Sequence, residues 1–317
     1  MKMKRLLKWT AVAVPVFLIV AVGVVIGGSY LEHRQLVEQE KDQFPAPGVR
    51  VEVNEEGHRL HVYAEGEGAK TLVFLSGLGT PSPFYDFKVL YEELSADYRV
   101  AVVERAGYGW SDVTSSPRDI DTVLRETRTA LERAGESPPY VLFPHSMAGL
   151  EAIYWATLHP EEIEAVIGLD AVVPRYVEEA EDLPSLSPAI TFLTRTGLVR
   201  NQPGVFENNF HAMKKGRLTE AEAQVAETIF YRRVHTPNMH AEVDALRSNA
   251  RIVSDAGTPD VPFHAFISGE NPDQLWRDSI ASYAASTGGQ HMVLDGGHYI
   301  HLDYPERIAE QSRELIE

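Results

Sequence analysis

The sequence has 317 residues, of which 44% are apolar and 24% are charged, and it contains no cysteine. This composition excludes a wholly disordered or collagen-like chain, and it excludes disulfides, zinc–thiolate sites and a cysteine nucleophile. The formal net charge is −17, which argues against nucleic-acid binding because neutralisation of phosphates supplies most of that affinity.

The charge is unevenly distributed. Four cations precede the first acidic residue, Glu32, so the head carries +4 and the remainder of the chain carries −21. The four cations are Lys2, Lys4, Arg5 and Lys8. An acidic body suits a solvated domain, so the basic head needs a separate explanation.

Residues 9–30 form an uncharged segment of 22 residues, long enough as a helix to cross a hydrocarbon layer of roughly 30 Å. Trp9 and Tyr30 lie at its two ends, where interfacial aromatic residues are typical. We therefore predict a basic cytoplasmic head at 1–8, a transmembrane anchor at 9–30 and a stalk at 31–48. The positive-inside rule then places the remaining chain on the extracytoplasmic side.

A cleaved signal peptide is the alternative interpretation of the same segment. Gly27, Gly28 and Ser29 are small enough for a cleavage site, although the apolar run exceeds the usual length of about 7–15 residues. Either interpretation predicts export, and cleavage would give a secreted protein.

Residues 49–317 alternate strand and helix patterns. Strands are expected at 49–54, 59–65, 71–75, 99–104, 140–143, 165–169, 262–268 and 290–294. Helices are expected at 83–94, 119–134, 148–159 and 303–316. Such alternation predicts the α/β class, with a mostly parallel central sheet covered by helices on both faces.

One stretch interrupts this alternation after the sixth strand. Residues 172–258 contain helical patterns, such as 218–233 and 239–254, but no clear strand. The stretch is too long for a loop in a compact domain. We predict a helical cap inserted into the α/β domain.

A serine lies where an apolar strand runs directly into a helix. The segment is Tyr-Val-Leu-Phe-Pro-His-Ser-Met-Ala-Gly-Leu, with the serine at position 146. A sharp strand-to-helix turn exposes this hydroxyl at the edge of the sheet and directs helix amides toward a developing oxyanion. Pro144 and Ala148 take the places where such turns usually carry glycine.

Three further motifs follow strands in the chain. They are Ser-Gly-Leu-Gly-Thr at 76–80, Glu-Arg-Ala-Gly-Tyr-Gly-Trp-Ser at 104–111 and Asp-Gly-Gly-His-Tyr-Ile-His at 295–301. Together with the Ser146 turn and the cap, this order resembles the α/β-hydrolase superfamily over nearly all of residues 49–317. The resemblance implies an α/β-hydrolase fold and a serine hydrolase of the esterase or prolyl-iminopeptidase-like type.

By this resemblance Ser146 is the nucleophile and His298 is the general base. The resemblance also implies that the backbone amides of Leu78 and Met147 form the oxyanion hole. His264 and His291 lie inside predicted strands, and His298 and His301 lack the pattern of a zinc site. The motif at 104–111 is expected to support the fold.

The acidic member of the triad has several candidates. Asp170 ends the buried strand at 165–169, and a carboxylate there needs a reason to be desolvated. Asp273 and Glu270 follow the next strand, but neither matches the spacing that the family usually shows. Asp170 is the favoured candidate and Asp273 is the alternative.

The expected reaction is hydrolysis of a carboxylic ester through an acyl-enzyme, with no metal and no organic cofactor. An aminopeptidase of the prolyl-iminopeptidase type is the runner-up, because acidic residues at 178–182 could hold a substrate ammonium. A non-catalytic binding module of the same fold is a third alternative. The expected partners are a small-molecule acyl substrate and the membrane, and not nucleic acid.

Overall fold

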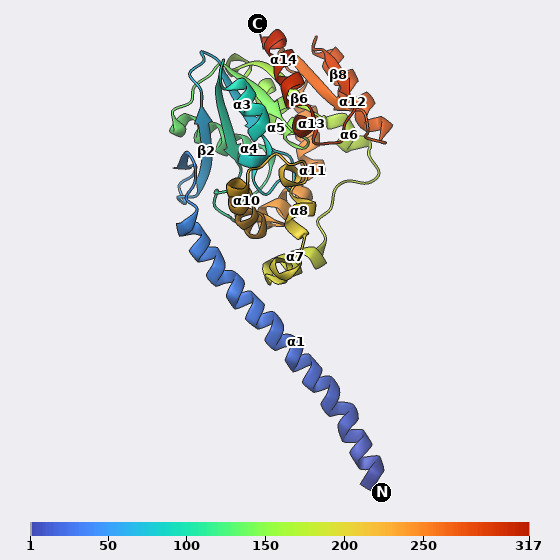
Figure 1. Cartoon of the computed structure of the whole chain (residues 1–317). Helices are drawn as coiled ribbons and strands as arrows, with labels where there is room; N and C mark the ends of the chain where they lie inside the picture. Colours follow the sequence, from blue (N-terminus) through green and yellow to red (C-terminus); the bar gives the residue numbers. More distant parts are fainter. Residues whose placement is uncertain (1, 317) are drawn as a thin grey trace.

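The computed structural model describes the backbone of residues 2–316 and the side chains of residues 12–316. A long helix at the N-terminus projects from a body in which helices surround one sheet (Figure 1). The sheet has eight strands in the order β1-β2-β4-β3-β5-β6-β7-β8. The first two neighbouring pairs in this order are antiparallel and the other five are parallel.

The strands are β1 (Val49–Glu52), β2 (Arg59–Glu65), β3 (Thr71–Leu75), β4 (Arg99–Glu104), β5 (Tyr140–Pro144), β6 (Ile163–Leu169), β7 (Phe263–Ser268) and β8 (His291–Leu294). They confirm the predicted mostly parallel sheet. β1 is two residues shorter than expected because Asn54 begins a turn and accepts hydrogen bonds from the amides of Gly57 and His58.

The helices that cover the sheet are α2 (Pro83–Asp86), α3 (Lys88–Leu94), α4 (Ile120–Ala134), α5 (Ala148–Leu158), α12 (Gln274–Ser286), α13 (Ile300–Asp303) and α14 (Pro305–Ile316), with a short 3-10 turn η1 (Pro160–Glu162). The predicted helix at 83–94 is divided at Phe87, whose ring lies between Phe74 and His301. The last helix begins at Pro305, because proline is favoured in the first helical turn.

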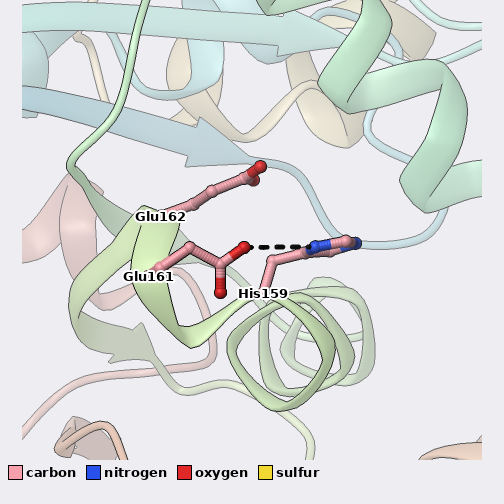
Figure 2. Close-up of side chains that lie close together, drawn as sticks. All are labelled: His159, Glu161 and Glu162. Atoms are coloured by element: carbon pink, nitrogen blue, oxygen red, sulfur yellow. Dashed lines mark ion pairs between the residues drawn. The ribbon is translucent and has the colours of Figure 1, made fainter.

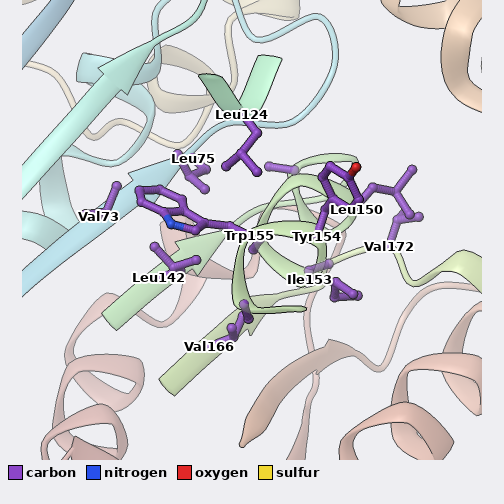
Figure 3. Packing of buried hydrophobic residues seen from close by; sticks show 14 of the residues in the cluster. Val73, Leu75, Leu124, Leu142, Leu150, Ile153, Tyr154, Trp155, Val166 and Val172 are labelled. Carbon is purple, nitrogen blue, oxygen red and sulfur yellow. The ribbon is translucent and has the colours of Figure 1, made fainter. Parts of the chain in front are cut away.

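The two faces of the sheet bury separate apolar clusters. In β3, Leu72 and Phe74 point to the cluster that contains α3, α13 and α14, while Val73 and Leu75 point to the one that contains α4, α5 and α12. This is the two-residue period of a strand buried on both faces. Figure 3 shows Trp155 of α5 at the centre of the second cluster, against side chains of β3, β5 and β6.

Helices alone fill the described chain between β6 and β7, as the cap prediction expects. They are α6 (Pro174–Glu179), α7 (Pro188–Arg195), η2 (Leu198–Asn201, a 3-10 turn), α8 (Val205–Asn209), α9 (His211–Lys214), α10 (Glu220–Arg233) and α11 (Pro237–Ala256). Thr219 and Glu222 form a capping box at the start of α10, and Thr236 caps α11. These caps satisfy amides that a helix leaves unpaired at its first turn.

The N-terminal helix α1 runs without a break from Lys2 to Gln43, so it contains the predicted anchor and residues 31–43 of the predicted stalk. Its stretch from Val12 onward is long and apolar enough to cross a membrane, and the apolar side chains there are exposed. The cations of the head lie outside the residues whose side chains are described. The C-terminal end of α1 is bound to the cap, where the two terminal guanidinium nitrogens of Arg200 pair with Glu40 at 2.6 and 2.8 Å.

Candidate active site

Ser146 lies on a strained turn between β5 and α5. Its φ of 53° falls in the left-handed region that non-glycine residues rarely adopt. The neighbouring chain leaves little room, since a Cβ on Gly77 would lie 2.6 Å from the Ser146 Cβ, and one on Gly149 would lie 2.0 Å from the Val172 carbonyl oxygen. The close approaches therefore fall at Gly77 and Gly149, so Pro144 and Ala148 are accommodated in the turn.

Asp170 and His298 are in direct contact. The His298 Nδ1 lies 2.7 Å from the Asp170 Oδ2, although 128 residues separate the two in the chain. The Asp170 carboxylate is fully buried, and its Oδ1 accepts hydrogen bonds from the Ser268 amide at 2.9 Å and the Trp276 Nε1 at 3.0 Å. Three donors thus compensate for the desolvation of this carboxylate and hold the imidazole in one orientation.

The two other candidate acids have other roles, although Asp273 lines a cavity together with Ser146 and His298. Asp273 caps α12 by accepting a hydrogen bond from the Trp276 amide, and Glu270 is exposed. The structure brings Asp170, and neither Asp273 nor Glu270, to the His298 ring. Trp276 is part of this arrangement, but no motif in the sequence indicates it.

The two amides expected to bind an oxyanion come from different loops. Met147 follows Ser146 directly, and Leu78 lies in the loop after β3. Among the described residues, neither amide donates a hydrogen bond to another protein atom. Both residues are partly exposed, so these donors are available to a ligand.

Arg105 binds the loop that carries Leu78. Its Nη1 donates a hydrogen bond of 2.7 Å to the Ser76 carbonyl, and its guanidinium pairs with Glu242 of α11 and Glu151 of α5. Burial alone would lower the pKa of Arg105, but Glu242 beside it raises the pKa above its ordinary value. The motif at 104–111 therefore supports the site as well as the fold. No pattern in the sequence indicates that Glu242 of the cap is the partner of Arg105.

His145, directly before Ser146, is buried. Burial lowers its pKa well below the ordinary value, and the nearby His298 lowers it further. Its Nε2 lies 3.1 Å from the His298 carbonyl oxygen, which indicates that Nε2 carries the proton. His145 therefore positions the His298 loop. His301 instead contacts the buried Asp86 at 3.2 Å.

Ser146 and His298 line the same cavity of about 250 Å³. Its walls are mostly apolar and include Tyr176, Val177 and Leu246 from the cap. Such a cavity can hold a small apolar group beside a serine hydroxyl, an imidazole and the Met147 backbone. This arrangement suits attack on a carbonyl carbon.

A separate polar cluster lies at the other end of α5. His159, Glu161 and Glu162 bring ligand atoms within 4.8 Å of one another, and His159 pairs with Glu161 (Figure 2). Glu162 is already held by Arg128 and by the Trp155 Nε1 at 2.7 Å. The prediction of a metal-free mechanism rests on side-chain chemistry and stays a prediction.

Comparison with known proteins identifies the family. Residues 72–311 match the sequence model of the alpha/beta hydrolase family. The uncharacterized protein YbdG of Bacillus subtilis (strain 168) is 32% identical over 90% of this chain and 91% of its own length. Epoxide hydrolase 4 of Mus musculus is 29% identical over 41% of this chain and 36% of its own.

Solved structures share the fold. The enol-lactonase of Burkholderia xenovorans LB400 has a TM-score of 0.62 at 18% identity, covering 85% of this chain and 100% of its own. The epoxide hydrolase VrEH1 of Vigna radiata has a TM-score of 0.61 at 19% identity, covering 84% and 97%. The chain belongs to the alpha/beta hydrolase family, and it is a hydrolase.

Proposed function

We propose that this hydrolase cleaves carboxylic esters through an acyl-enzyme formed on Ser146. The observation that carries the proposal is the contact between His298 and the buried Asp170 at the cavity that Ser146 also lines. A serine hydroxyl is a weak nucleophile at neutral pH, so a base that is held in the correct tautomer must take its proton. Asp170 holds that tautomer by accepting from Nδ1, which leaves Nε2 free for the proton of Ser146.

The chemical steps balance with side chains and water. Ser146 Oγ attacks the carbonyl carbon as its proton passes to His298, and the amides of Leu78 and Met147 stabilise the oxyanion. His298 then protonates the departing alcohol. Water, deprotonated by the same imidazole, attacks the acyl-enzyme and releases the carboxylic acid.

The identity of the nucleophile favours an acyl substrate over an epoxide. If Ser146 opened an epoxide ring, its oxygen would be left in an ether, which water does not hydrolyse under these conditions. An ester of Ser146 is hydrolysed readily, so the enzyme can turn over. Activity on epoxides, named for two of the related proteins, is therefore not proposed for this chain.

An ester substrate is also favoured over a peptide with a free N-terminus. The acidic residues at 178, 179, 181 and 182 are exposed, and they are not among the residues that line the Ser146 cavity. Esters also carry better leaving groups than amides. Asp273 does line that cavity, but its carboxylate already caps α12, and the acidic run at 178–182 is not among the lining residues.

We further propose that α1 anchors the enzyme in a membrane, with the N-terminus cytoplasmic and the catalytic body extracytoplasmic. The exposed apolar helix and the four cations before it support this arrangement.

A fluorophosphonate probe together with a substrate panel tests the proposed reaction. The full chain in detergent is expected to be labelled, and Ser146→Ala is expected to lose both labelling and roughly 10⁴-fold or more of its ester turnover. A chain-length series of p-nitrophenyl esters, compared with amino-acid naphthylamides, reports the substrate class. Folded wild-type protein that hydrolyses the naphthylamides but none of the esters would contradict the proposal.

A further inference from the structure

The cap helix α7 has its polar and apolar faces reversed. Thr191 and Thr194 are buried, whereas Ile190, Phe192 and Leu193 are 46%, 51% and 42% exposed. The buried threonines are satisfied, since the Thr191 Oγ1 lies 2.8 Å from the His240 Nε2 and the Thr194 Oγ1 donates to the Thr191 carbonyl. Ile190 and Leu193 also line a partly open cavity, whereas Phe192 does not. A surface helix in water normally shows the opposite pattern, so the exposed side of α7 around Phe192 is suited to an apolar surrounding.

α7 lies at the level where α1 changes from apolar to charged. Gly197, two residues after α7, packs so closely against α1 that a Cβ there would lie 2.4 Å from the His33 Cβ and 3.1 Å from the Ser29 carbonyl oxygen. The uncharged run of α1 ends at Tyr30, and the first charged residue after that run is Glu32. In Figure 1, α7 lies on the side of the body toward which α1 extends, and β8 lies at the opposite side.

A second, larger cavity of about 600 Å³ lies behind α7. Its lining is mainly apolar and includes Ile190, Leu193 and Leu198 in and near α7, together with Gly79 and Tyr299 from the α/β body. Gly79 follows Leu78 in the oxyanion loop, and Tyr299 follows His298. The volume falls within the roughly 300–1,000 Å³ of common ligand sites.

We propose that the apolar face of α7 rests in the lipid surface of the membrane that α1 enters, and that the cavity behind it accepts the hydrocarbon chain of an ester residing in that membrane. This inference rests on the proposed ester hydrolysis and anchoring. The bilayer is the favoured occupant of the face because the contact of Gly197 with Ser29 and His33 sets α7 beside the end of the membrane segment.

The absence of cysteine from the sequence gives a direct physical test that does not depend on activity. In the full chain reconstituted into phosphatidylcholine–phosphatidylglycerol vesicles, Phe192→Cys receives a polarity-sensitive nitrobenzoxadiazole label. Val293→Cys, also an exposed apolar site but on β8, is the matched control. The label at 192 is expected to shift to shorter wavelength and to be quenched by spin-labelled lipids, and the label at 293 is not.

Two results would overturn the membrane contact. One is equal emission and equal quenching at positions 192 and 293. The other is a shift at position 192 without quenching by the spin-labelled lipids, which would indicate that a second copy of the chain covers the face.

An activity comparison tests the source of the substrate. Phe192→Glu places a charge on the outer face at a residue that does not line the cavity. Turnover of water-soluble p-nitrophenyl butyrate is expected to stay unchanged, while turnover of a long-chain monoacylglycerol held in vesicles is expected to fall about tenfold as apolar contact with the bilayer is lost. Val293→Glu is expected to change neither rate.

An unchanged rate on the vesicle-held ester in Phe192→Glu would contradict delivery from the membrane. Failure of the proposed reaction looks different, because the wild type would then hydrolyse neither ester and would not react with the fluorophosphonate. The fluorescence comparison decides the membrane contact in that case as well.

Discussion

Two residues of the candidate site have left-handed backbone conformations without being glycine. Ser146 has a φ of 53° and Asp170 a φ of 46°. Such conformations cost on the order of 1–3 kcal/mol each and persist only where the surrounding structure holds them. At Asp170 the compensation is visible, because its amide donates to the Phe266 carbonyl and its carboxylate has three donors.

The role of Asp170 can be tested by comparing two substitutions. Asp170→Asn is expected to lower ester turnover roughly 10³–10⁴-fold, because an amide in its place cannot hold the imidazole in the required tautomer. Asp273→Asn is expected to keep turnover within about threefold, since a neutral asparagine still caps α12. Steady-state kinetics on a soluble ester measure both effects. The reverse ranking would show that Asp273 is the acid.

Buried His145 predicts a pH dependence of stability. Its folded-state pKa lies below 6.5, so the unfolded chain takes up a proton that the folded chain does not as the pH falls through 6.5. The free energy of unfolding therefore falls below that pH, with a contribution of about 1.4 kcal/mol per pH unit. We expect the free energy of unfolding, measured with urea at several pH values between 6.5 and 5, to fall less steeply with decreasing pH in His145→Gln than in the wild type. The difference in steepness should be about 1.4 kcal/mol per pH unit.

His291→Gln serves as the control for this measurement, because His291 is exposed on β8. The pH dependence of its free energy of unfolding is expected to match that of the wild type. Identical slopes in the wild type and His145→Gln would show that His145 takes a proton in the folded protein.

At the scale of elements, one buried ion pair joins the cap to the loop that carries Leu78. Arg105 follows β4, Glu242 lies in α11, and the guanidinium between them also binds the carbonyl of Ser76. The position of the cap and the position of the Leu78 loop are therefore mechanically linked.

Loosening this pair is expected to affect both stability and turnover. Glu242→Gln should lower the free energy of unfolding by on the order of 2 kcal/mol, because a buried guanidinium loses a charged partner. Ester turnover should fall as the Leu78 amide loses its fixed position. Chemical denaturation and kinetics are compared with Asp244→Asn, an exposed change on the same helix. Equal effects of the two variants would remove any special role for Glu242.

The sequence predicts elements best where the signal is local. β3 and β4 match their predicted bounds because each is a short apolar run between turn residues, and α4 begins after its cap Asp119 and ends at Gly135 with a φ of 88°. Likewise, the small residues around Ser146 and the glycines before His298 are visible in the sequence.

The partners of these residues come from distant segments. Trp276 reaches Asp170 across 106 positions, and Glu242 reaches Arg105 across 137. No periodicity or spacing along one chain encodes such pairs, because they depend on how the cap and the sheet pack. From the positions after strand ends, the sequence leaves three candidates for the acid that contacts His298. The fold is needed to show that Asp170 is the one in contact.

At the scale of the whole molecule, the proposed role of α1 as a membrane anchor predicts where the enzyme works. The full chain is expected in the membrane fraction after carbonate washing, and protease added to intact spheroplasts is expected to digest the catalytic body. Replacing Lys2, Lys4, Arg5 and Lys8 with glutamine should weaken this orientation, because cations on the cytoplasmic side bias insertion. Immunoblotting of protease-treated cells measures the outcome, and protection of the body in the wild type would contradict the proposed topology.

Because α1 is one unbroken helix, the number of residues between the proposed membrane segment and the body sets both the distance and the rotation between them. In a helix each added residue advances the chain by about 1.5 Å and rotates the rest of the helix by about 100°. A flexible tether would tolerate such a change, but here one residue inserted between His33 and Glu40 would move Glu40 out of phase with Arg200. The catalytic body thus has a defined rotation about the axis of α1 relative to the proposed membrane segment. Inserting residues that make up whole helical turns would change the distance of the body from the membrane while nearly preserving that rotation.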